Sequence, residues 1–174
     1  MSKKIILIIS FLVFISNVKS QDVYIEYKLE KNYITKKYEV NGELNIDSIN
    51  KNELFDKTFY WIKNIKYTSD GYKWINSFDD NILIIKQYFK PENNLLGYTG
   101  LRIRFVLTFQ FYDNKIKFNY SNFYYYSLSD GNKVFFESGL NENDKKAKDK
   151  IINDVEVYTN TLINELEKYI KIVY

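Results

Sequence analysis

Hydrophobic and polar residues alternate through the middle of the chain. The alternation is clearest at residues 101–112, where every second side chain from Leu101 to Phe111 is apolar and most of the others are polar. This period of two predicts a strand with one buried face and one wet face. Asp113 and Asn114 form a predicted turn that joins this strand to the next in a hairpin. Similar patterns predict strands at 22–29, 33–44, 81–89, 115–126 and 134–136.

Two segments have a helical period instead. Between residues 50 and 65, apolar side chains return every three or four positions, which predicts a helix of about four turns. Either Ser48 or Asn50 can cap its first turn, and Glu53 lies at the capping-box distance from Asn50. Residues 143–172 predict a longer helix, with an apolar stripe formed by Ile151, Val155, Tyr158, Leu162, Leu166 and Tyr169.

The first 20 residues are typical of a cleaved secretory signal peptide. Two lysines precede a run at residues 5–15 that is apolar except for Ser10. That run is too short to span a bilayer, which needs about 20 residues. Val18 and Ser20 occupy the positions that a signal peptidase recognises, so we predict cleavage between Ser20 and Gln21. The product is expected to be exported to the periplasm or the extracellular space, soluble, without a transmembrane span, and not lipidated because the chain has no cysteine.

Cleavage would leave 174 − 20 = 154 residues, with no internal repeat or linker. We therefore predict a single α+β domain over residues 21–174, long enough to bury a core without disulfides or metal. The predicted order is two strands, a helix, a meander of antiparallel strands and a final helix.

Composition removes several classes of chemistry. The chain has no histidine and no cysteine, so the usual zinc and copper ligands, the commonest general base and the thiol nucleophile are all missing. No phosphate-binding loop, nucleophile elbow or calcium loop is present either. We expect no catalytic residue, no metal and no cofactor. Three of the 25 basic residues lie in residues 1–20, which leaves 22 against 22 acidic ones. A neutral mature chain argues against nucleic acid as a partner.

Five residues are candidate contacts for a partner. Trp74 follows a predicted turn, and Tyr124 and Tyr126 belong to a run of aromatic residues in a predicted strand. An outward-facing ring could stack on a sugar or a protein, whereas alternate rings of a strand are commonly buried. Arg102 and Arg104 share the polar side of the clearest strand. They could bind an anionic group or pair with acids on neighbouring strands.

One acidic group could be imagined as a pair for glycoside hydrolysis. Asp79 and Asp80 lie next to each other, with Glu92 nearby in sequence. Hydrolysis of this kind needs two carboxyl groups held about 5 to 10 Å apart. Because adjacent strand residues point to opposite faces, a turn or a strand start explains the two aspartates better.

Two motifs resemble a secreted bacterial family of unknown function with a TATA-binding-protein-like fold. The first is the helix segment, in which Lys51, Glu53, Leu54, Phe55, Lys57, Trp61 and Ile62 match the pattern of that family. The second is the hairpin from Tyr112 to Lys117, where Asn114 replaces a glycine and can take the same left-handed conformation. The resemblance covers about residues 33–126. It implies a curved antiparallel sheet with helices packed on one face, and no assigned activity.

Three hypotheses about function follow. The first is a non-enzymatic interaction module that contacts a protein or envelope partner through the face or edge of its sheet. The second is a small-ligand or glycan-binding module that uses Trp74 and outward tyrosines. The third is a hydrolase that uses carboxylates alone.

Overall fold

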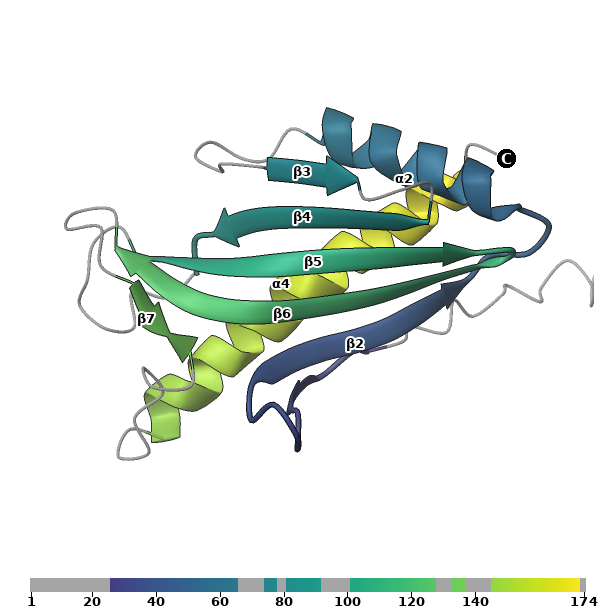
Figure 1. The fold of residues 1–174 in the computed structure, drawn as a ribbon. Coiled ribbons are helices and arrows are strands. Elements are labelled where there is room, and N and C mark those ends of the chain that lie inside the picture. The colour runs from purple at the N-terminus through teal and green to yellow at the C-terminus, as the bar shows by residue number, and fades with distance from the viewer. Residues whose placement is uncertain are drawn as a thin grey trace, which may run out of the picture.

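A seven-stranded antiparallel sheet forms the body of the protein (Figure 1). The computed structural model describes residues 26–65, 74–77, 81–91, 101–127, 133–136 and 145–172. The strands in these ranges are β1 (Leu29–Lys31), β2 (Tyr38–Asn45), β3 (Trp74–Ser77), β4 (Ile82–Phe89), β5 (Leu101–Tyr112), β6 (Lys115–Ser127) and β7 (Lys133–Phe135). Their order across the sheet is β1-β2-β6-β5-β4-β3. The far half of β6, beyond its pairing with β2, pairs with β7.

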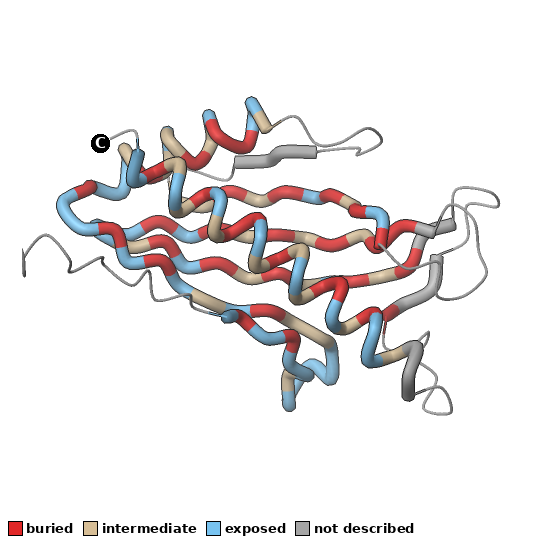
Figure 2. The backbone as a smooth tube through the Cα atoms, turned by 180° about the vertical axis from the view of Figure 1, so that it is seen from behind, coloured by how far each residue is buried: buried red, intermediate tan, exposed pale blue. Residues whose placement is uncertain are grey.

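Two helices, α2 (Lys51–Asn64) and α4 (Lys145–Ile172), pack on one face of this sheet. Figure 1 views the opposite face, with α4 running diagonally behind the strands, and Figure 2 shows α4 from its own side. Within the described chain, no helix covers the other face. The fold is therefore the expected α+β arrangement of an antiparallel sheet with helices on one side.

The core lies between the sheet and the helices. Of the apolar residues predicted to share one side of β5, those from Ile103 to Phe111 are buried there, including Ile103, Phe105 and Phe109 with no exposed surface. Trp61 of α2 is also buried. The expected stripe of α4 faces the core, with Ile151, Val155, Leu162 and Leu166 buried and Tyr158 and Tyr169 partly buried against it. Burying each large apolar side chain contributes about 1.5–3 kcal/mol before entropy is counted.

Local sequence patterns predicted the start of α2 and the turn between β5 and β6 correctly. Asn50 caps α2, and its side-chain oxygen accepts a hydrogen bond of 3.0 Å from the N–H of Glu53. Asn114 takes the left-handed conformation, with φ 62°. Its side chain also accepts a hydrogen bond from the N–H of Ile49, so the hairpin turn holds the segment that leads into α2. The side chain of Asp113 accepts from the N–H of Lys51, which supports the same helix start.

The first hairpin exists, but its predicted boundaries were wrong. The first strand was expected at 22–29 and is observed at Leu29–Lys31, and the second begins at Tyr38 rather than at residue 33. Residues 33–37 instead form the turn, in which Lys36 has a positive φ of 59°. Residues 22–25 of the predicted first strand lie outside the described ranges. β3 was not predicted from the sequence.

A bulge shifts the register between β5 and β6. Arg104 pairs with Tyr124 but Val106 pairs with Ser121, so one more residue lies on β6 than on β5 in this interval. Asn122 takes up the difference with a positive φ of 52°. The extra residue returns Phe123 to the buried face, where it is 1% exposed. In the described part of the chain, neither helix is both long and apolar enough to cross a membrane.

Candidate functional site

The sheet presents one face that the two helices leave uncovered, and we call its outward residues the open face. Residues directly opposite each other on antiparallel strands point to the same side, so the pairings define this surface in rows. None of its members is buried. They are Glu30 of β1; Glu39, Asn41, Glu43 and Asn45 of β2; Ile82, Ile84, Lys86 and Tyr88 of β4; Arg104, Val106, Thr108, Gln110 and Tyr112 of β5; and Lys115, Lys117, Asn119, Ser121 and Tyr124 of β6.

Two of the sequence candidates meet on the open face. Arg104 lies opposite Tyr124, and its guanidinium carbon is 5.7 Å from the centre of the Tyr124 ring. Tyr88 lies opposite Arg104 on the other side, so a row of Tyr, Arg and Tyr crosses three strands. A guanidinium stacked on a ring keeps its N–H donors in the ring plane available for carboxylates.

The other three candidates are placed differently. Arg102 is only 6% exposed, so within the described chain it does not offer its guanidinium at the surface. Trp74 occupies the register position opposite Lys86, and Tyr126 occupies the position opposite Arg102. The side chains of Trp74 and Tyr126 lie outside the described part of the structure.

A hollow of about 390 Å³ lies in the middle of the open face. Asn41, Thr108, Gln110, Lys117 and Asn119 contribute to its lining. The amide of Asn119 donates a hydrogen bond of 2.7 Å to the side-chain oxygen of Asn41. Amides and a hydroxyl in this arrangement can donate to and accept from a polar ligand, and Lys117 adds a positive charge.

Positive charge exceeds negative charge on the open face. It holds Lys86, Arg104, Lys115 and Lys117 against three acids, Glu30, Glu39 and Glu43. One of those acids, Glu43, lies 3.8 Å from Lys115, and both side chains are more than a third exposed. Such a pair contributes little to stability, and solvent reaches both partners. The surface can therefore still attract an anion at Arg104 and Lys117.

The described residues offer no evident catalytic centre. No three acidic side chains among them gather in a position to hold a metal ion. The proposed carboxylate group, Asp79, Asp80 and Glu92, lies outside the described ranges. Burial raises the pKa of Tyr125 above its usual range, and the electrostatic effect of Tyr38 adds to it. That ring is 4% exposed and packs on Phe136, so its shift reflects packing in the core.

Comparison with solved structures shows which fold these elements form. A protein from Parabacteroides distasonis, whose crystal structure is described as that of a TBP-like protein, aligns with a TM-score of 0.58 and 17% identity. The match covers 76% of this chain and 92% of that one. The fold is TATA-binding-protein-like. A DUF4468 family protein from Bacteroides ovatus aligns with a TM-score of 0.60 and 11% identity, over 87% of this chain and 95% of that one.

These matches confirm the TBP-like fold expected from the sequence motifs. At 17% and 11% identity the likeness concerns the fold alone, because similar folds carry unrelated functions. No protein-family model matches the chain, and no curated protein matches it.

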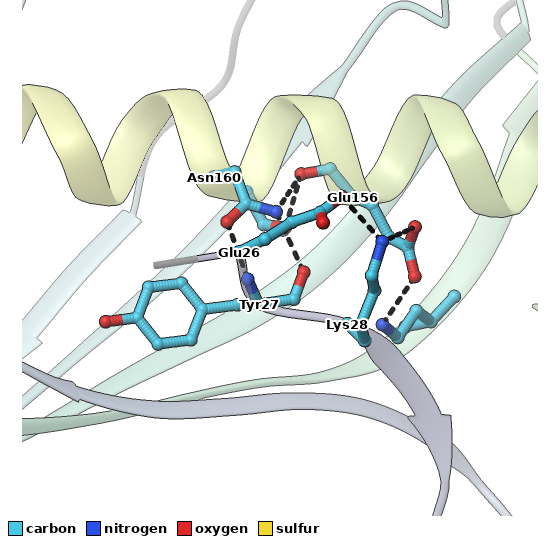
Figure 3. Close-up of polar contacts among 7 residues, drawn as sticks. Glu26, Tyr27, Lys28, Glu156 and Asn160 are labelled. Atoms are coloured by element: carbon cyan, nitrogen blue, oxygen red, sulfur yellow. Dashed lines mark hydrogen bonds and ion pairs between the residues drawn. The ribbon is translucent and has the colours of Figure 1, made fainter. Parts of the chain in front are cut away.

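Side chains of α4 hold the segment that enters this TBP-like sheet (Figure 3). The side chain of Asn160 accepts a hydrogen bond from the N–H of Tyr27 and donates one to its C=O, both of 2.8 Å. Glu156, one turn earlier, accepts from the N–H of Leu29 at 2.9 Å. The Tyr27 side chain crosses β2, and its hydroxyl donates to the C=O of Glu43. This clamp fixes the edge of the sheet that carries Glu43 on the open face.

Sequence reasoning did not find the clamp or the two lysines at the centre of the open face. Lys86 and Lys117 could have been found by extending the alternation of β5 to its neighbours once the pairing was known. Asn160 gives no such signal, because its partner is 133 residues away.

Proposed function

We propose that this protein is an exported, non-enzymatic module that binds an acidic segment of a partner protein across the open face. The observation that carries the proposal is the face itself. It is left uncovered by both helices and holds four basic side chains against three acidic ones. Two of the basic residues, Arg104 and Lys117, have no acidic side chain within ion-pair distance in the described part of the chain.

Charge complementarity favours this partner over a neutral one. Arg104 can bind a carboxylate through two N–H groups, and the adjacent Tyr88 and Tyr124 offer apolar ring area beside it. The basic residues lie on neighbouring strands, which are about 4.8 Å apart. An extended peptide that crosses these strands could therefore bring successive carboxylates to successive basic residues. Binding of this kind should be sensitive to salt.

Export is the second part of the proposal. It rests on residues 1–20, with cleavage between Ser20 and Gln21, and it places the module in the periplasm or outside the cell. The non-enzymatic part rests on the absence of histidine and cysteine from the sequence. A partner exposed to the same compartment, such as another envelope protein, fits both parts.

Charge reversal on the open face tests the proposal. The protein is crosslinked in intact exporting cells and recovered, and its adducts are identified for wild type, for Lys86→Glu with Lys117→Glu, and for a control pair. The control is Lys63→Glu with Lys150→Glu, which changes the net charge equally at exposed positions on the two helices. We expect one reproducible acidic partner whose yield falls at least tenfold only in the open-face variant. Equal loss in both variants, or none in either, would count against the open face.

A glycan-binding module is the second candidate, because the hollow of the open face is lined by amides and a hydroxyl. This arrangement suits sugar hydroxyls, and Tyr112 or Tyr124 could stack on a ring. Calorimetric titration with a panel of oligosaccharides discriminates the two. A sugar that binds wild type, and binds Gln110→Ala with Asn119→Ala at least tenfold more weakly, would favour this candidate.

Two further predictions concern hydrolytic activity and nucleic-acid binding. A carboxylate-only hydrolase would need Asp79, Asp80 or Glu92 as a close pair in a cleft. Nucleic acid is predicted not to bind, because the mature net charge is zero. Fluorescence anisotropy with a labelled DNA duplex at 150 mM salt checks this, and tight binding there would contradict the choice of a protein partner.

A further inference from the structure

The turn between β1 and β2 carries the two most exposed large apolar side chains in the described part of the chain. Tyr33 and Ile34 are each 86% exposed. The pairing of β2 with β6 begins only at Val40, so the hairpin before it extends beyond the rest of the sheet as an arm. Figure 2 shows this arm as an exposed projection at the edge of the molecule.

Hydrogen bonds hold the tip of this arm in one shape. The side-chain oxygen of Asn32 accepts from the N–H groups of Ile34 and Thr35, at 2.9 and 3.0 Å. The backbone of Asn32 bonds to that of Lys36 and Lys37 across the turn. The tip is thus ordered by its own contacts, although nothing described covers its two apolar side chains. A preformed tip loses less conformational entropy when it binds a surface.

Three lysines lie in the turn or next to it, and one of them contacts the apolar pair. The ammonium of Lys36 lies 4.2 Å from the centre of the Tyr33 ring, and that of Lys37 donates to the side chain of Asn122. Lys31 ends β1, and its ammonium lies 6.0 Å from the centre of the Tyr38 ring. None of the three forms an ion pair with a described residue. The nearest acids of the arm, Glu30 and Glu39, lie opposite each other in register, and the carboxylate of Glu39 accepts hydrogen bonds from the side chains of Asn32 and Thr35 at the turn.

We propose that this tip docks the protein on a bilayer that contains anionic phospholipid. A tyrosine ring suits the headgroup region because it is apolar with a polar end, and the adjacent Ile34 can enter the acyl boundary. The lysines bind the phosphate groups at the surface, where each cation adds to the attraction. This contact is separate from the open face and requires no helix that spans the membrane.

The alternative to a bilayer is a pocket in a partner protein that receives the tip. The charge around the tip distinguishes the two. A pocket for Tyr33 and Ile34 needs apolar walls, whereas an anionic membrane satisfies the apolar pair and all three lysines together. The account therefore predicts that the two kinds of residue act jointly and that salt weakens the binding.

Cosedimentation with sucrose-loaded vesicles tests the proposal. The processed protein is mixed with vesicles of phosphatidylcholine containing about 30% phosphatidylglycerol, or of phosphatidylcholine alone. We expect binding only to the anionic vesicles. The variant Tyr33→Ser with Ile34→Ser should bind about tenfold more weakly, and Lys36→Gln should weaken binding about fivefold. The control Tyr60→Ser, at a side chain 57% exposed on α2, should bind as wild type does.

A second measurement locates the contact independently of affinity. In the variant Tyr33→Trp, the new indole should shift its emission to the blue on anionic vesicles and be quenched by brominated lipid. The open-face variant Lys86→Glu with Lys117→Glu should keep wild-type vesicle binding. The proposal is overturned by wild type that ignores anionic vesicles, by tip variants that bind as wild type, or by loss of vesicle binding in the open-face variant.

Discussion

Gly42 lies where an aromatic ring crosses the sheet. A Cβ at this position would come within 2.3 Å of a Tyr27 ring carbon and 2.4 Å of a Phe118 ring carbon. The two rings themselves meet edge to face, with their centres 4.8 Å apart. Only a residue without a side chain leaves room for this pair, which connects the entering segment to the core.

We predict that Gly42→Ala lowers the free energy of unfolding by about 1–3 kcal/mol, because both rings must move. Urea titration measures the change. The matched control is Asn41→Ala, one residue away on the open face, which should cost less than about 1 kcal/mol. In a Tyr27→Ala background the Gly42→Ala change should cost less, because only the Phe118 ring then remains in the way. Equal costs in both backgrounds would mean that Tyr27 is not the obstacle.

The hydroxyl of Tyr27 gives a prediction about alkaline pH. Burial raises the pKa of Tyr27 from 10.0 to about 12, and the nearby charges of Glu167 and Glu43 act in the same direction. The unfolded chain therefore loses this proton first, so the protonated hydroxyl favours the folded state fully below pH 10. That contribution disappears as the pH rises from 10 to 12.

Tyr27→Phe removes this titration and leaves the others in place. The unfolding free energy of wild type should fall more steeply than that of Tyr27→Phe between pH 10 and 12, with the difference constant from pH 7 to 9. Urea titrations at each pH measure both curves. Parallel curves up to pH 12 would show that the hydroxyl is not held in its protonated form.

At the scale of elements, α4 binds an extended segment through side chains one turn apart. Four helical residues rise about 6.0 Å, and two residues of an extended chain span about 6.6 Å. Glu156 and Asn160 therefore match Leu29 and Tyr27 along the two backbones. The backbone groups of Tyr27 are satisfied by a helix rather than by a neighbouring strand, which explains why β1 begins only at Leu29.

Replacing Asn160 should break this connection. Asn160→Ala leaves the N–H and C=O of Tyr27 without their partners, so we predict a loss of about 2 kcal/mol in the free energy of unfolding. Hydrogen exchange at Tyr27 should accelerate as well. The control Asn153→Ala changes an exposed asparagine of the same helix and should stay within about 0.5 kcal/mol of wild type. Normal protection of Tyr27 in Asn160→Ala would contradict the clamp.

The elements that were predictable from sequence are those set by local contacts. The bounds of β5 follow from its alternation, the start of α2 from Asn50 and Glu53, and the hairpin turn from Asp113 and Asn114. The burial of Arg102 and the late start of β1 depend on segments distant in sequence, so no local pattern encodes them. The TBP-like fold was recognised from two motifs, whereas the basic character of the open face required the pairing of four strands.

At the scale of the whole molecule, the two faces of the sheet have different tasks. One face packs against α2 and α4 and supplies the core, with every buried apolar residue of β4 and β5 pointing that way. The open face contributes little to that core, so its residues are free to serve binding. The arm formed by β1 and β2 extends from the edge, so a module bound to a membrane by Tyr33 and Ile34 could keep the open face accessible.

Site-specific photocrosslinking in exporting cells tests the central claim that the open face contacts a partner. A photoreactive amino acid replaces Thr108 in the middle of the open face, and in a matched protein it replaces Val157, which is 53% exposed on α4. The account predicts a discrete protein adduct from position 108, reduced by Lys86→Glu with Lys117→Glu, and none from position 157. An adduct from position 157 alone, or equal adducts from both positions, would contradict it.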